Sequence, residues 1–567
     1  MRIALLALVL SVAASPIGSA PADAQPLSVF DLNPGPDDGK PEAFTLFDGR
    51  LYFVASDAVN GQELWRTDGT NEGTGLVVDL NPGAGHGFPL TLSGLPFELA
   101  PFDGELYVVA DDGTTGAELW ATDGTAAGTR LVKDIRPGSN GSQVRGLTAA
   151  GDLLYFVADD GSTGRELWRT DGTTDGTFRV RDVNPGAADG YLLGAPDLVA
   201  FDGALYFEAD DANGRELWRT DGTSDGTELV QDLNPGAADG GPFGLTVFDG
   251  ALYFTADDGT TGYELRRFAA GTSEIELVAD IRPGSDSSFP SAFAELDGAL
   301  YFTANDGVVG SELWSSDGTE DGTLLVKDIA PGASASVAFT TFVEFDGQLY
   351  FEANDRSLGW ELWTTDGTES GTRLVKDIGE GSRSGLDFAT FVVHDGAIYF
   401  RASDGETGVE LWRTDGTEAG TVLVEDLWEG TVDGLPASSS PAGLTVFDGA
   451  LYFAANGGDG KGRELWKLGG TPIPAEPAPS ASVEVSVWPN PAPSGLVRVR
   501  VTTTRAQRVT ATLHDVIGRG VGVLLDGDVG PGRAATASLP HGLADGVYVV
   551  RVATRDGVTS RRVAVVR

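Results

Sequence analysis

Acidic side chains are the residues of this sequence whose types and spacing could do chemistry. One Glu stands before a Leu-Trp pair, or once before Leu-Arg, in nine similar segments: Glu63, Glu118, Glu166, Glu216, Glu264, Glu312, Glu361, Glu410 and Glu464. One Asp stands before an x-Pro-Gly turn or its equivalent in nine segments: Asp31, Asp79, Asp134, Asp182, Asp232, Asp280, Asp328, Asp377 and Asp426. Because an active site is needed once and a fold-supporting contact in every segment, we expect these carboxylates to accept backbone N–H bonds at turns.

Two other uses of carboxylates stay open. Paired carboxylates can hydrolyse glycosides, but nothing singles out one pair among 84 acidic residues. Calcium prefers hard oxygen ligands, which Asp111-Asp112-Gly113, Asp159-Asp160-Gly161 and Asp257-Asp258-Gly259 offer. None of these turns has the alternating acidic positions and closing Glu of the twelve-residue calcium loop. Calcium is therefore the alternative to an expected absence of cofactors.

Histidine and glycine patterns do not indicate an active site. The only histidines are His86, His394, His514 and His541, and no Gly-x-Ser-x-Gly motif is present. Lys461 lies in a glycine-rich loop but is followed by Gly462, which does not match a phosphate-binding loop. We assign no catalytic, cofactor-binding or metal-ligating residue, and we expect that the protein is not an enzyme.

The repeated segments must position these side chains. Glu63–Thr70 reads ELWRTDGT, and its tryptophan recurs at steps of 48 to 55 residues, with Arg266 in one slot: Trp65, Trp120, Trp168, Trp218, Trp314, Trp363, Trp412 and Trp466. The pattern Glu-Leu-Trp-x-x-Asp-Gly-Thr resembles the signature of the bacterial ELWxxDGT repeat family over about residues 29–470. This resemblance implies a repeat architecture and carries no known chemistry.

Each repeat predicts four short antiparallel strands and no helix. In the fourth repeat these are the residues before Phe201, then 204–209, 216–220 and 228–233, each bounded by Gly, Pro, Asp or Asn. Leu205-Tyr206-Phe207 is apolar at successive positions, so both faces of the sheet must be covered. Four strands per period of about 50 residues predict an all-β fold, a β-propeller of about nine blades. The degenerate third and fifth repeats keep their spacing and should remain blades.

The two ends of the array complement each other. The chain begins with Val29–Leu32, which resembles the last strand of a repeat, and the array ends at Trp466-Lys467 without that strand. Because an open sheet edge invites aggregation, pairing the first strand into the final blade removes two edges at once. We expect the N-terminal strand to close a ring over residues 25–470.

Composition indicates where the protein is located and which partners it excludes. Residues 1–24 have the charged start, apolar middle and small-residue end of a signal peptide. With no cysteine, stability must come from packing rather than disulfides. A formal net charge of -46 repels nucleic acid and anionic membranes, so we expect neither as a partner. We expect a monomer that is secreted or held at the outer bacterial surface, without membrane insertion.

A second domain follows a proline-rich linker. Residues 471–482 read as a stiff, extended linker. Residues 483–567 carry 11 Arg and 6 Asp plus Glu, opposite in sign to the rest, and predict a small β-sandwich. The motifs Trp488-Pro489-Asn490-Pro491, Leu513–Arg519, Gly546–Val552 and Arg562–Val566 resemble the type A C-terminal sorting domain of the type IX secretion system. This resemblance implies export across an outer membrane, with the secretion machinery as a partner.

Variable loops point to a binding face. Loops after the first and third strands of a blade hardly vary, whereas the stretch from the x-Pro-Gly turn to Phe-Asp-Gly runs from 12 positions (Gly35 to Phe47) to 17 (Gly430 to Phe447) and 19 (Gly83 to Phe102). Function tends to lie on variable loops held by a rigid scaffold. We expect a binding or adhesion scaffold with a glycan or surface-protein ligand near 81–102 and 429–441. The alternatives are a propeller enzyme acting on extracellular polysaccharide and a purely structural envelope component.

Overall fold

The computed structural model describes residues 27–469, except 84, 89–96, 191–196, 338–340 and 387–388, and the strands of a C-terminal unit. The signal peptide expected at 1–24 and the linker expected at 471–482 lie outside the described residues. The described residues form β-strands and turns without a helix, as the repeat pattern predicts. They also contain no helix long and apolar enough to span a membrane.

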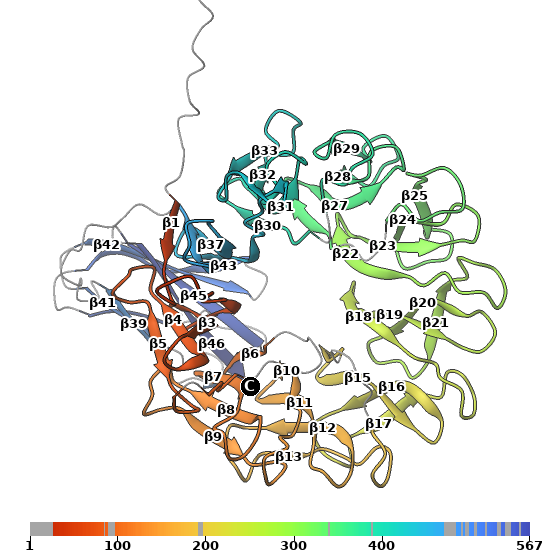
Figure 1. The fold of residues 1–567 in the computed structure, drawn as a ribbon. Helices are drawn as coiled ribbons and strands as arrows, with labels where there is room; N and C mark the ends of the chain where they lie inside the picture. Colours follow the sequence, from red (N-terminus) through yellow and green to blue (C-terminus); the bar gives the residue numbers. More distant parts are fainter. Residues whose placement is uncertain are drawn as a thin grey trace, which may run out of the picture. The chain divides into compact units, whose positions relative to one another are not determined.

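Nine four-stranded antiparallel sheets, numbered here as blades 1 to 9, follow one another along residues 27–469 and surround a common centre (Figure 1). Their strands, in chain order of the blades, are β2 (Glu42–Phe47), β3 (Arg50–Asp57), β4 (Gly61–Thr67) and β5 (Gly75–Val78); β6 (Leu99–Phe102), β7 (Glu105–Ala110), β8 (Glu118–Thr122) and β9 (Arg130–Lys133); β10 (Arg145–Ala150), β11 (Leu153–Asp159), β12 (Arg165–Thr170) and β13 (Phe178–Arg179); β14 (Val199–Phe201), β15 (Ala204–Asp211), β16 (Gly214–Thr220) and β17 (Glu228–Gln231); β18 (Phe243–Phe248), β19 (Ala251–Asp257), β20 (Tyr263–Ala269) and β21 (Ile275–Ala279); β22 (Ser291–Leu296), β23 (Ala299–Asn305), β24 (Ser311–Ser316) and β25 (Leu324–Lys327); β26 (Val343–Phe345), β27 (Gln348–Asn354), β28 (Trp360–Thr365) and β29 (Arg373–Lys376); β30 (Val392–His394), β31 (Ala397–Ser403), β32 (Val409–Thr414) and β33 (Val422–Glu425); and β36 (Ala442–Phe447), β37 (Ala450–Asn456), β38 (Arg463–Leu468) and β1 (Leu27–Phe30). The chain therefore folds as the predicted β-propeller.

The apolar triplet of each second strand explains how the blades stack. In β15 the side chains of Leu205 and Phe207 pack into the cluster shared with blade 3, whereas Tyr206 packs into the cluster shared with blade 5. All three are almost fully buried. Successive strand residues point to opposite faces, so one triplet serves two interfaces between blades. Fully burying each such side chain contributes about 1.5–3 kcal/mol, which replaces the missing disulfides.

Tight turns close the hairpins where the sequence predicts them. The first hairpin of blade 4 turns at Asp202 and Gly203, whose φ angles are 46° and 78°. Two consecutive residues with positive φ match the right-handed twist of the flanking strands. The Asp-Gly pairs after the first strands thus form hairpin turns, as expected.

The two degenerate repeats are blades, as predicted. In blade 5, Arg266 takes the slot of the tryptophan and is 2% exposed. Its guanidinium donates to the carbonyl of Ala256 (3.0 Å) and to Thr261 (2.7 Å), and it forms an ion pair with Asp258 (3.1 Å). A buried charge needs a counter-charge and hydrogen bonds, and this site supplies both.

The N-terminal strand completes the last blade, as the sequence predicts. β1 pairs antiparallel with β38, with Val29 opposite Trp466. Blade 9 also packs against blade 1, because Phe30 and Tyr452 share one buried cluster with Phe53. The Lys467 ammonium donates to the carbonyl of Gly69 in blade 1 (3.2 Å). The last sheet of the array therefore contacts the first.

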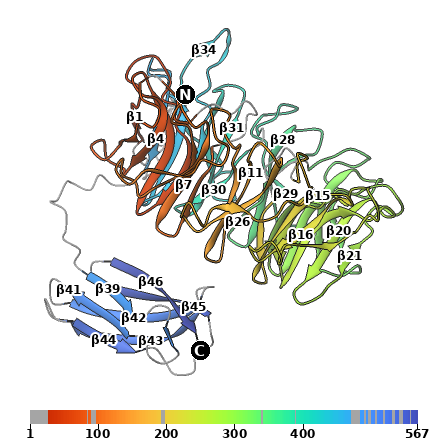
Figure 2. The ribbon, with the colours of Figure 1, turned by 90° about the horizontal axis from the view of Figure 1, so that it is seen from below.

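The chain divides into two compact units, residues 1–470 and 471–567. In the second unit one sheet has the order β39 (Val483–Trp488), β41 (Arg498–Thr503) and β44 (Ala534–Ser538), and the other has the order β40 (Ala492–Pro493), β46 (Gly557–Val566), β45 (Gly546–Thr554), β42 (Gln507–Asp515) and β43 (Gly520–Val529). Figure 2 shows the strands of these two sheets. Two sheets of short strands are what the alternating pattern of this region predicts.

Candidate functional site

The repeated glutamates hold the turns that follow the fourth strands. In blade 7, the Glu361 carboxylate accepts the backbone N–H groups of Ile378 (2.8 Å), Gly379 (3.0 Å) and Gly385 (2.8 Å). Glu464 does the same across the ends of the array, accepting from Leu32 (2.7 Å) and Gly39 (2.8 Å). The prediction that these glutamates accept backbone N–H bonds is confirmed. Each one closes the base of a variable loop.

Burial dominates the acidity of these glutamates. It raises the pKa of Glu361 to about 7, although the three N–H donors oppose the shift, and the nearby Asp377 raises it further. In Glu166 burial, together with Asp182, raises the pKa to about 8 against the hydrogen bonds of Val183 and Gly190. The glutamates whose pKa burial likewise raises to about 7 are Glu63, Glu118, Glu216, Glu312 and Glu464.

The aspartates before the turns behave differently, so their prediction holds only in part. The Oδ2 atom of Asp377 accepts a long bond from the N–H of Gly381 (3.2 Å). The buried Oδ1 atom has no hydrogen-bond partner within the protein in eight described residues, namely Asp79, Asp134, Asp182, Asp232, Asp280, Asp328, Asp377 and Asp426. Their charge acts on the neighbouring glutamates, as the effect of Asp377 on the pKa of Glu361 shows.

The Asp-Asp-Gly turns considered for calcium use their carboxylates locally. The Oδ1 atom of Asp112 accepts the N–H groups of Thr114 (2.8 Å) and Thr115 (2.9 Å) and both hydroxyls. Burial acts to raise the pKa of Asp112, but these bonds outweigh it and lower the pKa to about 2. Across the described part of the chain, no group of three or more His, Asp or Glu side chains is placed to hold a metal ion.

The histidines lie in separate parts of the fold. His86, in the loop after β5, accepts the backbone N–H of Gln62 at Nδ1 (3.0 Å). His394, on β30 of blade 8, is buried and packs against Tyr399, with ring centroids 5.9 Å apart. His514 lies on β42 in the second unit, and His541 is outside the described residues. His86 thus serves a turn and His394 a core contact, and the Nε2 atom of His514 lies 2.9 Å from the Thr512 hydroxyl.

The second variable loop contains an insertion. In blade 7 the glutamate bonds to the residue 24 positions later, whereas in blade 8 Glu410 accepts the N–H of Ser439, 29 positions later (2.7 Å). The extra residues form the hairpin of β34 (Thr431–Val432) and β35 (Leu435–Pro436), which projects from the ring in Figure 2. Its tip exposes Val432 (45%) and Leu435 (70%).

A cavity of about 460 Å³ lies beside this loop, on the face of the variable loops. Its described walls come from blades 7 and 8 and from the loops that follow their fourth strands: Trp360, Ser384, Gly385, Leu386, Arg401, Ala402, Ser403, Val409 and Ser440. This volume is within the range of small-ligand sites, which combine apolar walls with a few polar groups. The loop 429–441 therefore contributes Ser440 to the cavity. None of the described residues of the other expected loop, 81–102, lines it.

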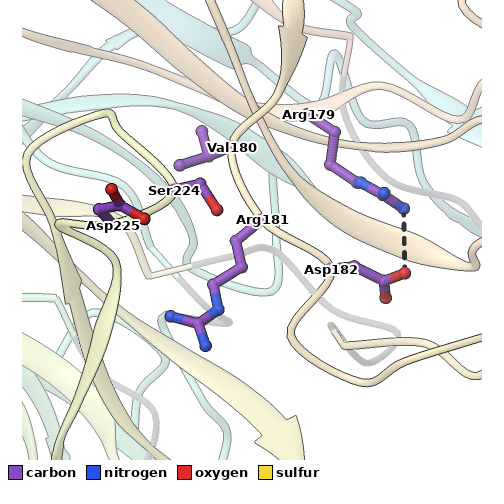
Figure 3. Close-up of a pocket in the computed structure, with 6 residues that line it drawn as sticks. All are labelled: Arg179, Val180, Arg181, Asp182, Ser224 and Asp225. Atoms are coloured by element: carbon purple, nitrogen blue, oxygen red, sulfur yellow. Dashed lines mark ion pairs between the residues drawn. The ribbon is translucent and has the colours of Figure 1, made fainter.

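A second cavity, of about 600 Å³, lies between β13 of blade 3 and the Asp-Gly-Thr loop of blade 4 (Figure 3). Arg179 pairs with Asp182 (3.4 Å), and Arg181 donates to the carbonyl of Thr227 in the next blade (2.5 Å). Lys133 and Lys376 make the equivalent contact in other blades. Of the charged side chains of this cavity, Arg181 thus joins two blades, and Arg179 and Asp182 pair within blade 3.

The cavity residues around Trp360 were not predicted from the sequence. Trp360 occupies the position before the repeated glutamate, and Ser384 lies 24 positions later, where its hydroxyl accepts the N–H of Trp360 (3.2 Å). The corresponding pair is Arg165 with Asp189 in blade 3, joined by a 2.6 Å ion pair. The available signal was that the residue before the glutamate differs between blades, whereas the glutamate is the same in all nine.

Fold and contacts define the first unit as a β-propeller whose repeated residues are structural. No protein-family model and no curated protein matches the chain. Among solved structures it is similar to a puromycin hydrolase (16% identity, TM-score 0.31, covering 68% of this chain and 61% of that one) and to a puromycin-hydrolyzing peptidase of Mycobacterium tuberculosis (10%, 0.36, 68% and 61%). The chain spans 61% of the length of each of these two enzymes.

It is also similar to PorZ of Porphyromonas gingivalis, described as an essential bacterial surface component of the type-IX secretion system (14% identity, TM-score 0.25, covering 95% of this chain and 87% of that one). All three TM-scores are below 0.5, so these likenesses add no argument about this chain.

Proposed function

We propose that this protein is a secreted or cell-surface binding scaffold of the ELWxxDGT repeat type. In this proposal the propeller binds a glycan or a surface protein through the face of the variable loops and performs no chemistry on it. The C-terminal unit acts as the export address of a type IX-like secretion system.

The observation that carries the binding proposal is that repeated and variable residues of the blades have different roles. The glutamates present in every blade bind the backbone of turns, as Glu361 illustrates. Two departures from the repeat, Trp360 and the inserted loop that carries Ser440, contribute instead to one cavity. Variable groups on a rigid scaffold are a common arrangement for ligand binding.

Charge supports a separate role for the C-terminal unit. Residues 483–567 carry a net positive charge within a chain whose formal net charge is -46. They also form their own compact unit with two sheets. A domain of opposite charge with its own core can be recognised, and removed, independently of the propeller.

An exchange of the inserted loop tests the binding proposal. Replacing residues 428–438 by the shorter segment 379–384 of blade 7 restores the 24-residue spacing, so the bond to Glu410 is kept. We expect wild-type protein to retain ligand on a glycan array or in pull-downs from co-cultured cells, with and without calcium, and the exchanged protein to lose it. Retention of a detected affinity after the exchange would place the site elsewhere.

A further inference from the structure

The cavity beside the inserted loop has an unusual composition for this protein. The sequence holds 84 acidic residues, yet none of the described residues that line the cavity is an Asp or a Glu. Among these described residues, Arg401 is charged and Ser384, Ser403 and Ser440 carry hydroxyl groups. Trp360 is the aromatic residue of this described lining. The described lining of the cavity thus offers an aromatic ring, a cation and several hydroxyls.

Trp360 is held in place by its backbone. Its carbonyl accepts the N–H groups of Gly385 and Leu386 (both 3.0 Å), and its own N–H donates to Ser384 (3.2 Å). The side chain is only partly buried. These bonds fix the backbone of Trp360 at the cavity wall, so this segment need not be ordered when a ligand binds.

The fold does not require these two side chains. The position of Trp360 holds other residues in the other blades, namely Gln62, Ala117, Arg165, Arg215, Tyr263, Ser311, Val409 and Arg463. The position of Arg401 holds Val54, Val109, Val157, Glu208, Thr255, Thr303, Glu352 and Ala454 elsewhere. The repeat architecture therefore does not fix the identity of either side chain.

We propose that this cavity is a carbohydrate subsite that takes one pyranose unit of a glycan. The apolar C–H face of the sugar stacks on the indole of Trp360, while the hydroxyls of Ser384 and Ser440 and the positive charge of Arg401 face its hydroxyl or carboxylate oxygens. This inference rests on the proposed binding function and names the ligand class for the same site.

A sugar fits this cavity better than the other chemistries that an aromatic plate could bind. Nucleic acid is repelled by a net charge of -46. An exposed protein anchor needs a largely apolar pocket, whereas here four polar side chains share the wall with Trp360. A pyranose ring has one apolar face and hydroxyls at its edge. It therefore matches both the indole and the polar side chains of the lining.

The test uses replacements that the repeat itself provides. Trp360→Val and Arg401→Ala introduce the residues found at Val409 and Ala454, so both variants should fold. Trp360→Tyr introduces the residue found at Tyr263 and should keep the stacking. The matched control is Tyr263→Val, which removes an aromatic ring from the same position of blade 5.

Calorimetry with neutral and uronic-acid oligosaccharides gives the readout. We expect Trp360→Val to weaken binding of at least one of them tenfold or more, and Trp360→Tyr and Tyr263→Val to stay within about threefold of wild type. Loss in Arg401→Ala only for the uronic series assigns the carboxylate to Arg401, and equal loss in both series assigns hydroxyls to it. Binding unchanged in Trp360→Val, or no binding of any oligosaccharide by wild type, overturns the subsite.

The proposed function has a separate readout. If the loop exchange abolishes pull-down of a surface protein while no oligosaccharide binds, the scaffold role stands and the carbohydrate subsite fails. If the exchange changes nothing and wild type retains neither class of ligand, both proposals fail.

Discussion

At the scale of single residues, this propeller depends on buried carboxylates placed where backbone donors would otherwise be unpaired. Glu361 is fully buried and satisfies three N–H groups of one turn. A buried N–H without a partner costs more than an average hydrogen bond gains. The residue is therefore repeated because every loop base has the same donors.

Truncating one of these glutamates should destabilise the protein. Glu361→Ala leaves the N–H groups of Ile378 and Gly379 without an acceptor and that of Gly385 with the Trp360 carbonyl alone, and we expect a loss of about 3 kcal/mol or more. Glu361→Gln keeps one acceptor oxygen and should lose less. Thermal unfolding measures both, with the exposed Glu418→Ala as control. Equal melting temperatures for Glu361→Ala and Glu418→Ala would contradict the role.

Stability should fall as the pH rises from about 5 to 8. Burial raises the pKa of Glu361 and most of its counterparts to about 7, from a value of 4.5 in the unfolded chain. The folded state therefore binds protons more tightly, so this stabilisation is complete below 4.5 and is lost as the pH rises through 7. Melting temperatures at pH 5, 6, 7 and 8 measure the effect.

Repulsion between exposed carboxylates also lowers stability as the pH rises. This contribution must be separated from that of the buried glutamates. In 0.5 M salt the repulsion between exposed carboxylates is screened, whereas buried groups are screened little. A pH dependence that disappears in 0.5 M salt would rule out the buried glutamates as its source. Below about pH 4 the trend should reverse, because turn bonds keep the pKa of Asp112 near 2 and its stabilisation is lost there.

At the scale of elements, β1 has the largest consequence for its length. Its four residues cover the edge of β38, and the turn after it supplies the N–H groups of Leu32 and Gly39 to Glu464. One short segment thus completes a sheet and closes a loop base. Unpaired strand edges are templates for pairing with other chains.

Deleting residues 25–35 should expose that edge. We expect a lower melting temperature and soluble aggregates, because β38 loses its partner and the Glu464 carboxylate loses the N–H of Leu32. Size-exclusion chromatography and thermal unfolding measure the two effects. Monomeric elution with an unchanged melting temperature would show that the strand contributes little.

Polar contacts between blades add to the apolar clusters. Lys133 and Lys376 each donate to the carbonyl of the threonine that ends the Asp-Gly-Thr loop of the next blade, at 2.6 and 2.8 Å. Arg181 makes the same contact beside the cavity of Figure 3. A basic side chain at this position thus fixes one blade against the next.

At the scale of the whole molecule, two compact units with opposite charge share one chain. Our proposal gives binding to the acidic propeller and export to the basic unit. Removing residues 483–567 should then leave a folded propeller in the periplasm of the producing cell, because the export signal is lost. Immunoblots of periplasm, cell surface and medium measure this. Normal arrival of the truncated chain at the surface or in the medium would refute the export role.

The sequence by itself determined the repeat, the four strands of each blade, the turns and the pairing of the N-terminal strand. These features are local or periodic: Leu205-Tyr206-Phe207 fixes a strand buried on both faces, and Asp202-Gly203 fixes its hairpin. The role of the glutamates followed from their presence in all nine blades.

Only the tertiary structure decided which variable side chains meet. Trp360 of blade 7, Arg401 of blade 8 and Ser440 of the loop that joins blades 8 and 9 line one cavity. Their distance along the chain hides this, because a position that varies from blade to blade carries no periodic signal. Contacts between blades depend on how whole sheets pack, and that packing brings together residues that no local pattern relates.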